Sequence, residues 1–327
     1  MGAKARNLIM RNKAVAIPLL IALFLPLVKA NIMAFILNLL IVSFMYICLA
    51  QSWNILAGFC GLLSMGHCAF FGLGVYITIM VLNQNVNILW AVLISAAVNV
   101  ALAYVVGAVS VRVKDIFFAM VTLALAQLLY NLSMQWIEVT RGPRGLIMPP
   151  VYMMSRQTLF YIALAMTVLF VLAVYFIRRS RMGTMFVALR ENEELAKSLG
   201  VNVAKWKIIA SVVSAVMASA VGSYYTLYIR SVQPSAVFTF SVTMKIMIVA
   251  FVGGKGTVKG PVLGAVIIII DELIRGWLGG GRYSGLPGVI YGVILALVIL
   301  FLPDGLISIF RSGRKEGRDE AAREEMV

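Results

Sequence analysis

The chain is 327 residues long, 62% hydrophobic and only 13% charged, with a mean hydropathy of +0.97. Water-soluble domains carry about 25% charged residues, so this composition excludes an ordinary soluble core and indicates an integral membrane protein. The net charge of +15 predicts membrane orientation and no nucleic-acid partner, because the cations gather at both chain ends and in one central loop.

The chain begins with a basic segment, residues 1–13, followed by an apolar stretch at 14–29. These are also the features of a cleaved signal peptide, with Val28-Lys29-Ala30 as the nearest approach to a cleavage site. Because the lysine fits such a site poorly, we expect a retained first span. Further stretches near the length of about 20 residues that a spanning helix needs are 32–50, 66–82, 88–111, 116–137, 157–178, 206–229 and 286–303.

Two shorter apolar pieces, 240–252 and 261–275, flank the tract GGKGTVKG. We expect either two tilted or broken spans or a re-entrant pair, joined by a tight cytoplasmic turn. The tract is not a phosphate-binding loop, because Gly256 separates Lys255 from the hydroxyl of Thr257. Placing the basic loops inside predicts an all-α polytopic bundle of about ten transmembrane helices, or eight if the pair is re-entrant, with both termini cytoplasmic.

This reading divides the chain into three parts: an N-terminal cytoplasmic segment (1–13), a transmembrane domain (14–305) and a cytoplasmic tail (306–327). Within the domain, the loop 179–205 is too polar to span and too patterned for a linker. Phe186, Leu189, Leu195 and Leu199 recur at helical offsets, which predicts a short amphipathic helix. Gly200 is placed to end it.

Such a helix can lie on lipid headgroups or dock in a protein groove. Its three glutamates, at 191, 193 and 194, favour a protein partner because anionic lipid repels them. Glu194-Leu195-Ala196, three residues and then Gly200 resemble the E-A-A-x-x-x-G signature of the permeases of ATP-binding-cassette (ABC) importers, with leucine in the second position.

The same family resemblance extends over about residues 40–305. The segments ALRENEELAKSLGVN, QSWNILAGFCGLLSMGHCAFFGLGVYI, IFFAMVTLALAQLL and FVGGKGTVKGPVLGAV are similar to those of LivM-type branched-chain amino acid permeases. The loop Thr140–Leu146 resembles the family's T-G-G-x-x-G-L segment but carries Arg141 and Pro143 at glycine positions. Relatives handle urea or short amides as well as leucine, isoleucine and valine, and the sequence does not separate these substrates.

The resemblance implies a permease subunit in a bacterial inner membrane. It implies four kinds of partner: a second homologous permease chain, two cytoplasmic ATPases that use ATP and Mg²⁺, a periplasmic amino-acid-binding protein, and membrane lipid. This chain itself is expected to hold no cofactor and no metal, and to catalyse no reaction. The residues expected to dock the ATPase are Arg190, Glu191, Glu194, Leu195, Ala196, Leu199 and Gly200.

The segment GFCGLLSMGHCAFFGLG, residues 58–74, interrupts oily sequence with five glycines and the chain's one histidine. Small residues let membrane helices approach closely, which favours a helix–helix seam. A broken helix that lines the solute route is compatible with that seam. The candidate pathway-lining or packing residues are Asn54, Gly58, Gly61, Ser64, Gly66, His67, Phe70, Gly72 and Gly74.

His67 is expected to be a neutral packing residue or, alternatively, a substrate contact. The acidic side chains lie nearly all in loops or tails. Asp271 and Glu272, near the outer end of a short span and close to Arg275, are expected to form a structural pairing at the interface rather than a proton relay. A self-sufficient secondary transporter or channel for a small polar solute is the alternative function. Carboxylates within the spans would have favoured it.

Overall fold

The computed structural model describes residues 31–111, 113, 115–278, 292–293 and 306. The expected spans at 14–29 and, apart from two residues, 286–303 lie outside this part, as do both terminal segments. Within it, six helices are long and apolar enough to cross a membrane. They are Ala34–Phe59, Ile88–Ser110, Ile116–Gln135, Arg156–Arg179, Val203–Tyr228 and Pro234–Gly253. The chain is thus an α-helical polytopic membrane protein, and the total of about ten spans stays a prediction.

The helices and strands follow one another in this order: α2 (Asn31–Trp53), π-helix η2 (Asn54–Phe59), α3 (Cys68–Leu82), α4 (Ile88–Ser110), α5 (Asp115–Gln135), α6 (Ile137–Thr140), 3₁₀-helix η3 (Gly142–Arg144), β1 (Leu146–Ile147), 3₁₀-helix η4 (Pro150–Tyr152), α7 (Arg156–Arg179), α8 (Arg181–Glu191), α9 (Glu193–Ser198), α10 (Val203–Tyr228), β2 (Ser231–Val232), α11 (Pro234–Val237), α12 (Phe240–Gly253), α13 (Gly260–Gly264) and α14 (Val266–Leu278).

Short polar side chains set where several of these helices begin. Asn87, Ser155 and Asn202 each accept a hydrogen bond from a backbone N–H in the first turn of the helix that follows, at 3.2, 3.1 and 3.0 Å. Each of these bonds satisfies one of the N–H groups that a helix leaves unpaired at its start. The capping residues in the sequence therefore determine where these three helices begin.

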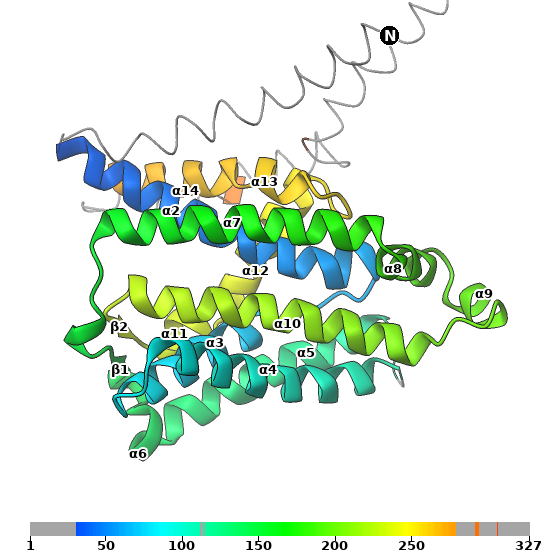
Figure 1. Ribbon diagram of the computed structural model, residues 1–327, viewed down its shortest axis with the longest axis horizontal. Coiled ribbons are helices and arrows are strands. Elements are labelled where there is room, and N and C mark those ends of the chain that lie inside the picture. The colour runs from blue at the N-terminus through cyan, green and yellow to red at the C-terminus, as the bar shows by residue number, and fades with distance from the viewer. Residues whose placement is uncertain (1–30, 112, 114, 279–291, 294–305, 307–327) are drawn as a thin grey trace, which may run out of the picture.

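The long helices run side by side, with α10 between a group formed by α3, α4 and α5 and a group formed by α2, α7 and α14 (Figure 1). α10 packs on α3 and α4, and α2 packs on α7. Small residues allow this approach: a Cβ on Gly222 would lie 2.4 Å from the Phe71 carbonyl oxygen. Hydroxyl pairs add to it, as between Thr78 and Ser223 at 2.8 Å. Close backbone contact and interhelical hydrogen bonds are what hold membrane helices together.

The two ends of the bundle differ. At one end, α8 and α9 project beyond the long helices; at the other lie α6 and the antiparallel pair β1 and β2 (Figure 1). The strand register pairs Leu146 with Val232 and Ile147 with Ser231. An all-α expectation does not include this small sheet, which ties the α5–α7 connection to the chain after α10.

Candidate functional site: a projecting helix pair and a broken span

The polar loop forms two helices where the sequence predicted a single amphipathic one. Asn192 adopts extended backbone between α8 and α9, and its side chain accepts a hydrogen bond from the N–H of Leu195 at 3.0 Å. The single-helix prediction is wrong because Asn192 caps a new helix better than it continues the old one. The predicted common apolar face is therefore divided.

The division separates buried from exposed apolar residues. Phe186 and Leu189 on α8 are buried, whereas Leu195 and Leu199 are 58% and 76% exposed. Glu194 beside them is also exposed. An exposed leucine pair with an adjacent carboxylate at the tip of a projection is a surface suited to a protein groove.

The projection is anchored at its base by a partly buried ion pair. Lys207 of α10, whose side chain is 5% exposed, lies 2.7 Å from a carboxylate oxygen of Glu193 at the start of α9. Its ammonium also reaches the Ser110 carbonyl at the end of α4, at 3.4 Å. At the far end, Gly200 has φ +82°, and the N–H of Val201 donates to the carbonyl of Ala196 at 3.0 Å. This is the glycine-terminated helix end that the sequence predicted.

A second set of contacts connects α8 with the broken span. Arg190, in the last turn of α8, donates from Nη1 to the carbonyl oxygen of Gly58 in η2 at 2.9 Å. It also pairs with its neighbour Glu191. The last turn of α8 and the first break in the α2 span are therefore joined through one guanidinium.

The turn between α12 and α13 completes this junction. Asn54 of η2 accepts from the N–H of Gly256 and donates to the carbonyl of Thr257, both at 2.8 Å. Arg178 donates to the Gly256 carbonyl and stacks over the Phe59 ring. We call these groups, Asn54, Gly58, Arg178, Arg190, Gly256 and Thr257, the loop junction. Partial burial, and then the nearby Arg190 charge, lower the pKa of Lys255 in the same turn.

The glycine-rich segment breaks the span between α2 and α3. The helix changes to the wider π form at Asn54, and residues 60–67 are not helical. The irregular backbone is bonded within the protein: the Trp53 indole donates to the Ser64 carbonyl at 2.9 Å, and the N–H of Met65 donates to the Thr122 hydroxyl at 3.1 Å. Broken backbone at membrane depth needs such internal partners.

The glycines of this segment closely approach α5, α8 and α10, and also the Phe238 ring that follows α11. A Cβ on Gly66 would lie 1.7 Å from the Thr122 carbonyl oxygen of α5, and one on Gly74 2.7 Å from the Ser219 carbonyl oxygen of α10. Gly72 lies against the Phe238 ring, and Phe70 is buried. Gly61 has φ +85° beside Arg190. These positions exclude side chains because neighbouring backbone or rings already fill the space.

His67 is fully buried at the start of α3. Its Nε2 lies 2.8 Å from the Ser52 hydroxyl, which itself donates to the Leu49 carbonyl. Nε2 is therefore the donating nitrogen, and Nδ1 has no hydrogen-bond partner among the described residues. The structure places this ring inside the protein, against Ser52 and Phe70.

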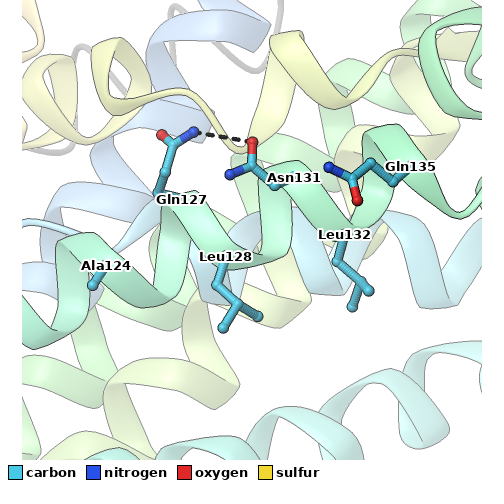
Figure 2. A pocket seen from close by; sticks show the side chains of 6 residues that line it. All are labelled: Ala124, Gln127, Leu128, Asn131, Leu132 and Gln135. Carbon is cyan, nitrogen blue, oxygen red and sulfur yellow. Dashed lines mark hydrogen bonds between the residues drawn. The ribbon is translucent and has the colours of Figure 1, made fainter.

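The sequence predicted one of two further polar features only in part and missed the other. Asp271 of α14 is fully buried and pairs with Arg275 at 3.0 Å, as predicted, but also with Lys245 of α12 at 2.7 Å. Lys245 gave no signal because it stands alone in an apolar stretch. On α5, Gln127, Asn131 and Gln135 line an open groove (Figure 2); their regular spacing was the signal that could have found them.

Together, the apolar spans, the projecting polar helix pair and the internally bonded break define a multi-pass membrane protein with a polar projection at one end of its bundle. A family model described as "branched-chain amino acid transport system / permease component" matches residues 35–303. The chain belongs to this family of transport permeases.

Individual relatives agree with the family match. The LivM high-affinity branched-chain amino acid transport permease of Salmonella typhimurium is 26% identical, over 86% of this chain and 72% of its own length. LivM of Escherichia coli K12 is also 26% identical, over 82% and 69%. The LivH permease of S. typhimurium is 23% identical, over 80% and 91%. No solved structure gives a significant match.

Proposed function

We propose that this chain is the LivM-like permease subunit of an ABC importer for branched-chain amino acids in a bacterial inner membrane. It pairs with a LivH-like permease chain, as the similarity to both LivM and LivH relatives supports. ATP and Mg²⁺ are used by two separate cytoplasmic ATPase subunits, and a periplasmic binding protein delivers the amino acid. Both termini and the α8–α9 projection then lie in the cytoplasm.

The observation that carries this proposal is the α8–α9 projection. Its tip presents Leu195, Leu199 and Glu194 to solvent, while its base is fixed by the Lys207–Glu193 pair. A rigid base with an apolar tip can transmit the movement of a docked partner. The loop junction gives that movement a direct route, because Arg190 contacts the backbone of the broken span.

The broken span is the element on which this movement acts. Residues 60–67 lack the regular hydrogen bonds of a helix, so their arrangement depends on neighbours such as Thr122 of α5. The adjoining η2 is bonded to the α12–α13 turn through Asn54. Closure of the ATPases shifts α8 and thereby η2, which changes how α3 and α5 face the solute route. Asn54 and Gly58 act as positioning residues in this scheme, and His67 supports the start of α3.

Co-purification tests the docking role. Glu194→Lys reverses the charge beside the exposed leucines, and Gly200→Pro is incompatible with the positive φ at the end of α9. Both variants should recover less ATPase with the permease from membranes and should import less leucine. Arg181→Ala, at the exposed start of α8, is the control that should retain both. Undiminished ATPase recovery and uptake in both test variants contradict the docking role.

A further inference from the structure

A row of carboxamides follows one exposed face of α5. Gln127, Asn131 and Gln135 are exposed and four residues apart, so they lie one above another along the helix. Nε2 of Gln127 donates to Oδ1 of Asn131 at 3.3 Å. Leu128 and Leu132 extend from the adjoining face, away from the amides (Figure 2). With Ala124 these side chains line a shallow, wide-open groove whose lining comes from α5 alone.

The row lies on a helix that is apolar elsewhere on its exposed side. Ile116, Phe117 and Met120, in the first half of α5, are 71%, 60% and 59% exposed. Exposed amides on a spanning helix are costly against lipid tails, which offer no hydrogen-bond partner. The second half of this face is therefore suited to water, solute or a polar protein surface, whereas the first half is suited to lipid or an apolar protein surface.

The chemistry of the groove matches an aliphatic amino acid. Each carboxamide carries donors and acceptors, so the row can accept from an ammonium and donate to a carboxylate. The amides are uncharged, which avoids the tight hold that a fixed opposite charge would give to a passing zwitterion. The two leucines supply an apolar strip beside the row for a branched side chain.

The amide row follows, along α5, the point at which this helix contacts the broken span. Thr122, one turn before Gln127, accepts from the N–H groups of Met65 and Gly66 at 3.1 and 3.4 Å. The amide half of α5 extends from there toward the β1–β2 end of the bundle, opposite α8 and α9 (Figure 1). A solute that enters at the β1–β2 end meets the amides before it reaches the level of the break.

We propose that Gln127, Asn131 and Gln135, with Leu128 and Leu132, form this chain's wall of the solute route. The facing surface of the second permease chain forms the other wall, since the groove is open on one side. The row binds the zwitterionic end of the amino acid in transit. This inference rests on the proposed function and specifies the surface that the solute touches.

Thiol labelling tests the wall without any transport measurement. Cysteine is placed singly at 127, 131 and 135 in the assembled transporter in membrane vesicles, with Tyr104→Cys on the exposed face of α4 as the control. The native cysteines Cys48, Cys60 and Cys68 are buried, and the parent chain gives their background. A water-soluble maleimide should label the three α5 positions at least tenfold faster than position 104. Equal rates at position 104 and in the α5 row overturn the wall.

Uptake kinetics test the binding role. Gln127→Leu and Asn131→Leu should each lower the maximal rate of leucine uptake, measured with the binding protein saturated, about tenfold or more, the size expected for one lost hydrogen bond to a charged group, whereas Tyr104→Leu should leave it unchanged. Variants are compared only in complexes that retain the partner permease and ATPases. A change below twofold in the triple Leu variant overturns the role while leaving the proposed function standing. Absence of ATP-driven leucine uptake by the unmutated complex overturns the proposed function itself.

Discussion

Arg190 hydrogen-bonds the projection formed by α8 and α9 to the broken span, so its removal should separate ATP hydrolysis from transport. Nη1 lies 2.9 Å from the Gly58 carbonyl oxygen, and the side chain is 33% exposed. Hydrogen bonds to charged groups contribute about 1.5–3 kcal/mol, and partial exposure places this one near 1.5–2 kcal/mol. That free energy corresponds to about a ten- to thirtyfold loss of the joined arrangement.

The assay compares leucine uptake with ATP hydrolysis in the same proteoliposomes. Although the sequence placed Arg190 among the ATPase-docking residues, its guanidinium bonds to Gly58 in the broken span. Arg190→Ala should therefore retain ATPase recovery and hydrolysis, because the exposed leucines of α9 are untouched, while uptake per ATP falls about tenfold by the free energy above. Arg190→Lys should recover little of the loss, since one ammonium does not reproduce the spread of guanidinium donors. Arg181→Ala is the matched control on the same helix. Unchanged uptake per ATP in Arg190→Ala refutes the transmission role.

Three further predictions concern packing, docking and the buried ion cluster. Gly66→Ala would place a Cβ 1.7 Å from the Thr122 carbonyl oxygen, so the free energy of unfolding should fall by about 1–3 kcal/mol or more. Gly292→Ala, with open space around it, is the control. Equal melting temperatures of the two variants in detergent contradict the close approach. Leu199→Asp should reduce ATPase co-purification several-fold, because Leu199 is 76% exposed at the tip of the projection. Val151→Asp, at a position 86% exposed on η4, is the control and should not reduce it. Equal ATPase recovery from both variants rejects an apolar contact at Leu199. Asp271→Asn leaves the partly exposed cations of Lys245 and Arg275 facing a neutral buried group and should destabilise the protein by about 1.5–3 kcal/mol. Thermal unfolding should show partial rescue on adding Lys245→Met, and additive losses rule out the pairing.

Much of the membrane organisation could be predicted from the sequence, because the signals there are local. The span predicted at 88–111 is α4 at Ile88–Ser110, and the one at 157–178 is α7 at Arg156–Arg179. Both are continuous apolar stretches that begin after a capping side chain. The glycine at the end of α9 was predictable for the same reason, since a positive φ at Gly200 is a local requirement.

The functional contacts were harder to predict because they depend on distant partners. Nothing near Asn54 in the sequence indicates that it binds the turn at Gly256, 202 residues away. Helical offsets alone placed Leu195 and Leu199 with Phe186, but the cap at Asn192 redirected them to the surface. Periodicity assumes an unbroken helix, and one competing side-chain bond was enough to end it.

Reconstituted transport tests the central claim most directly. The complex of this chain, its partner permease and the ATPases is placed in liposomes with the binding protein outside, and labelled leucine is supplied with ATP and Mg²⁺ inside. We predict uptake that requires ATP, is competed by isoleucine and valine, and is insensitive to ionophores that collapse ion gradients. Uptake by this chain alone, driven by an ion gradient without ATP, would contradict the account.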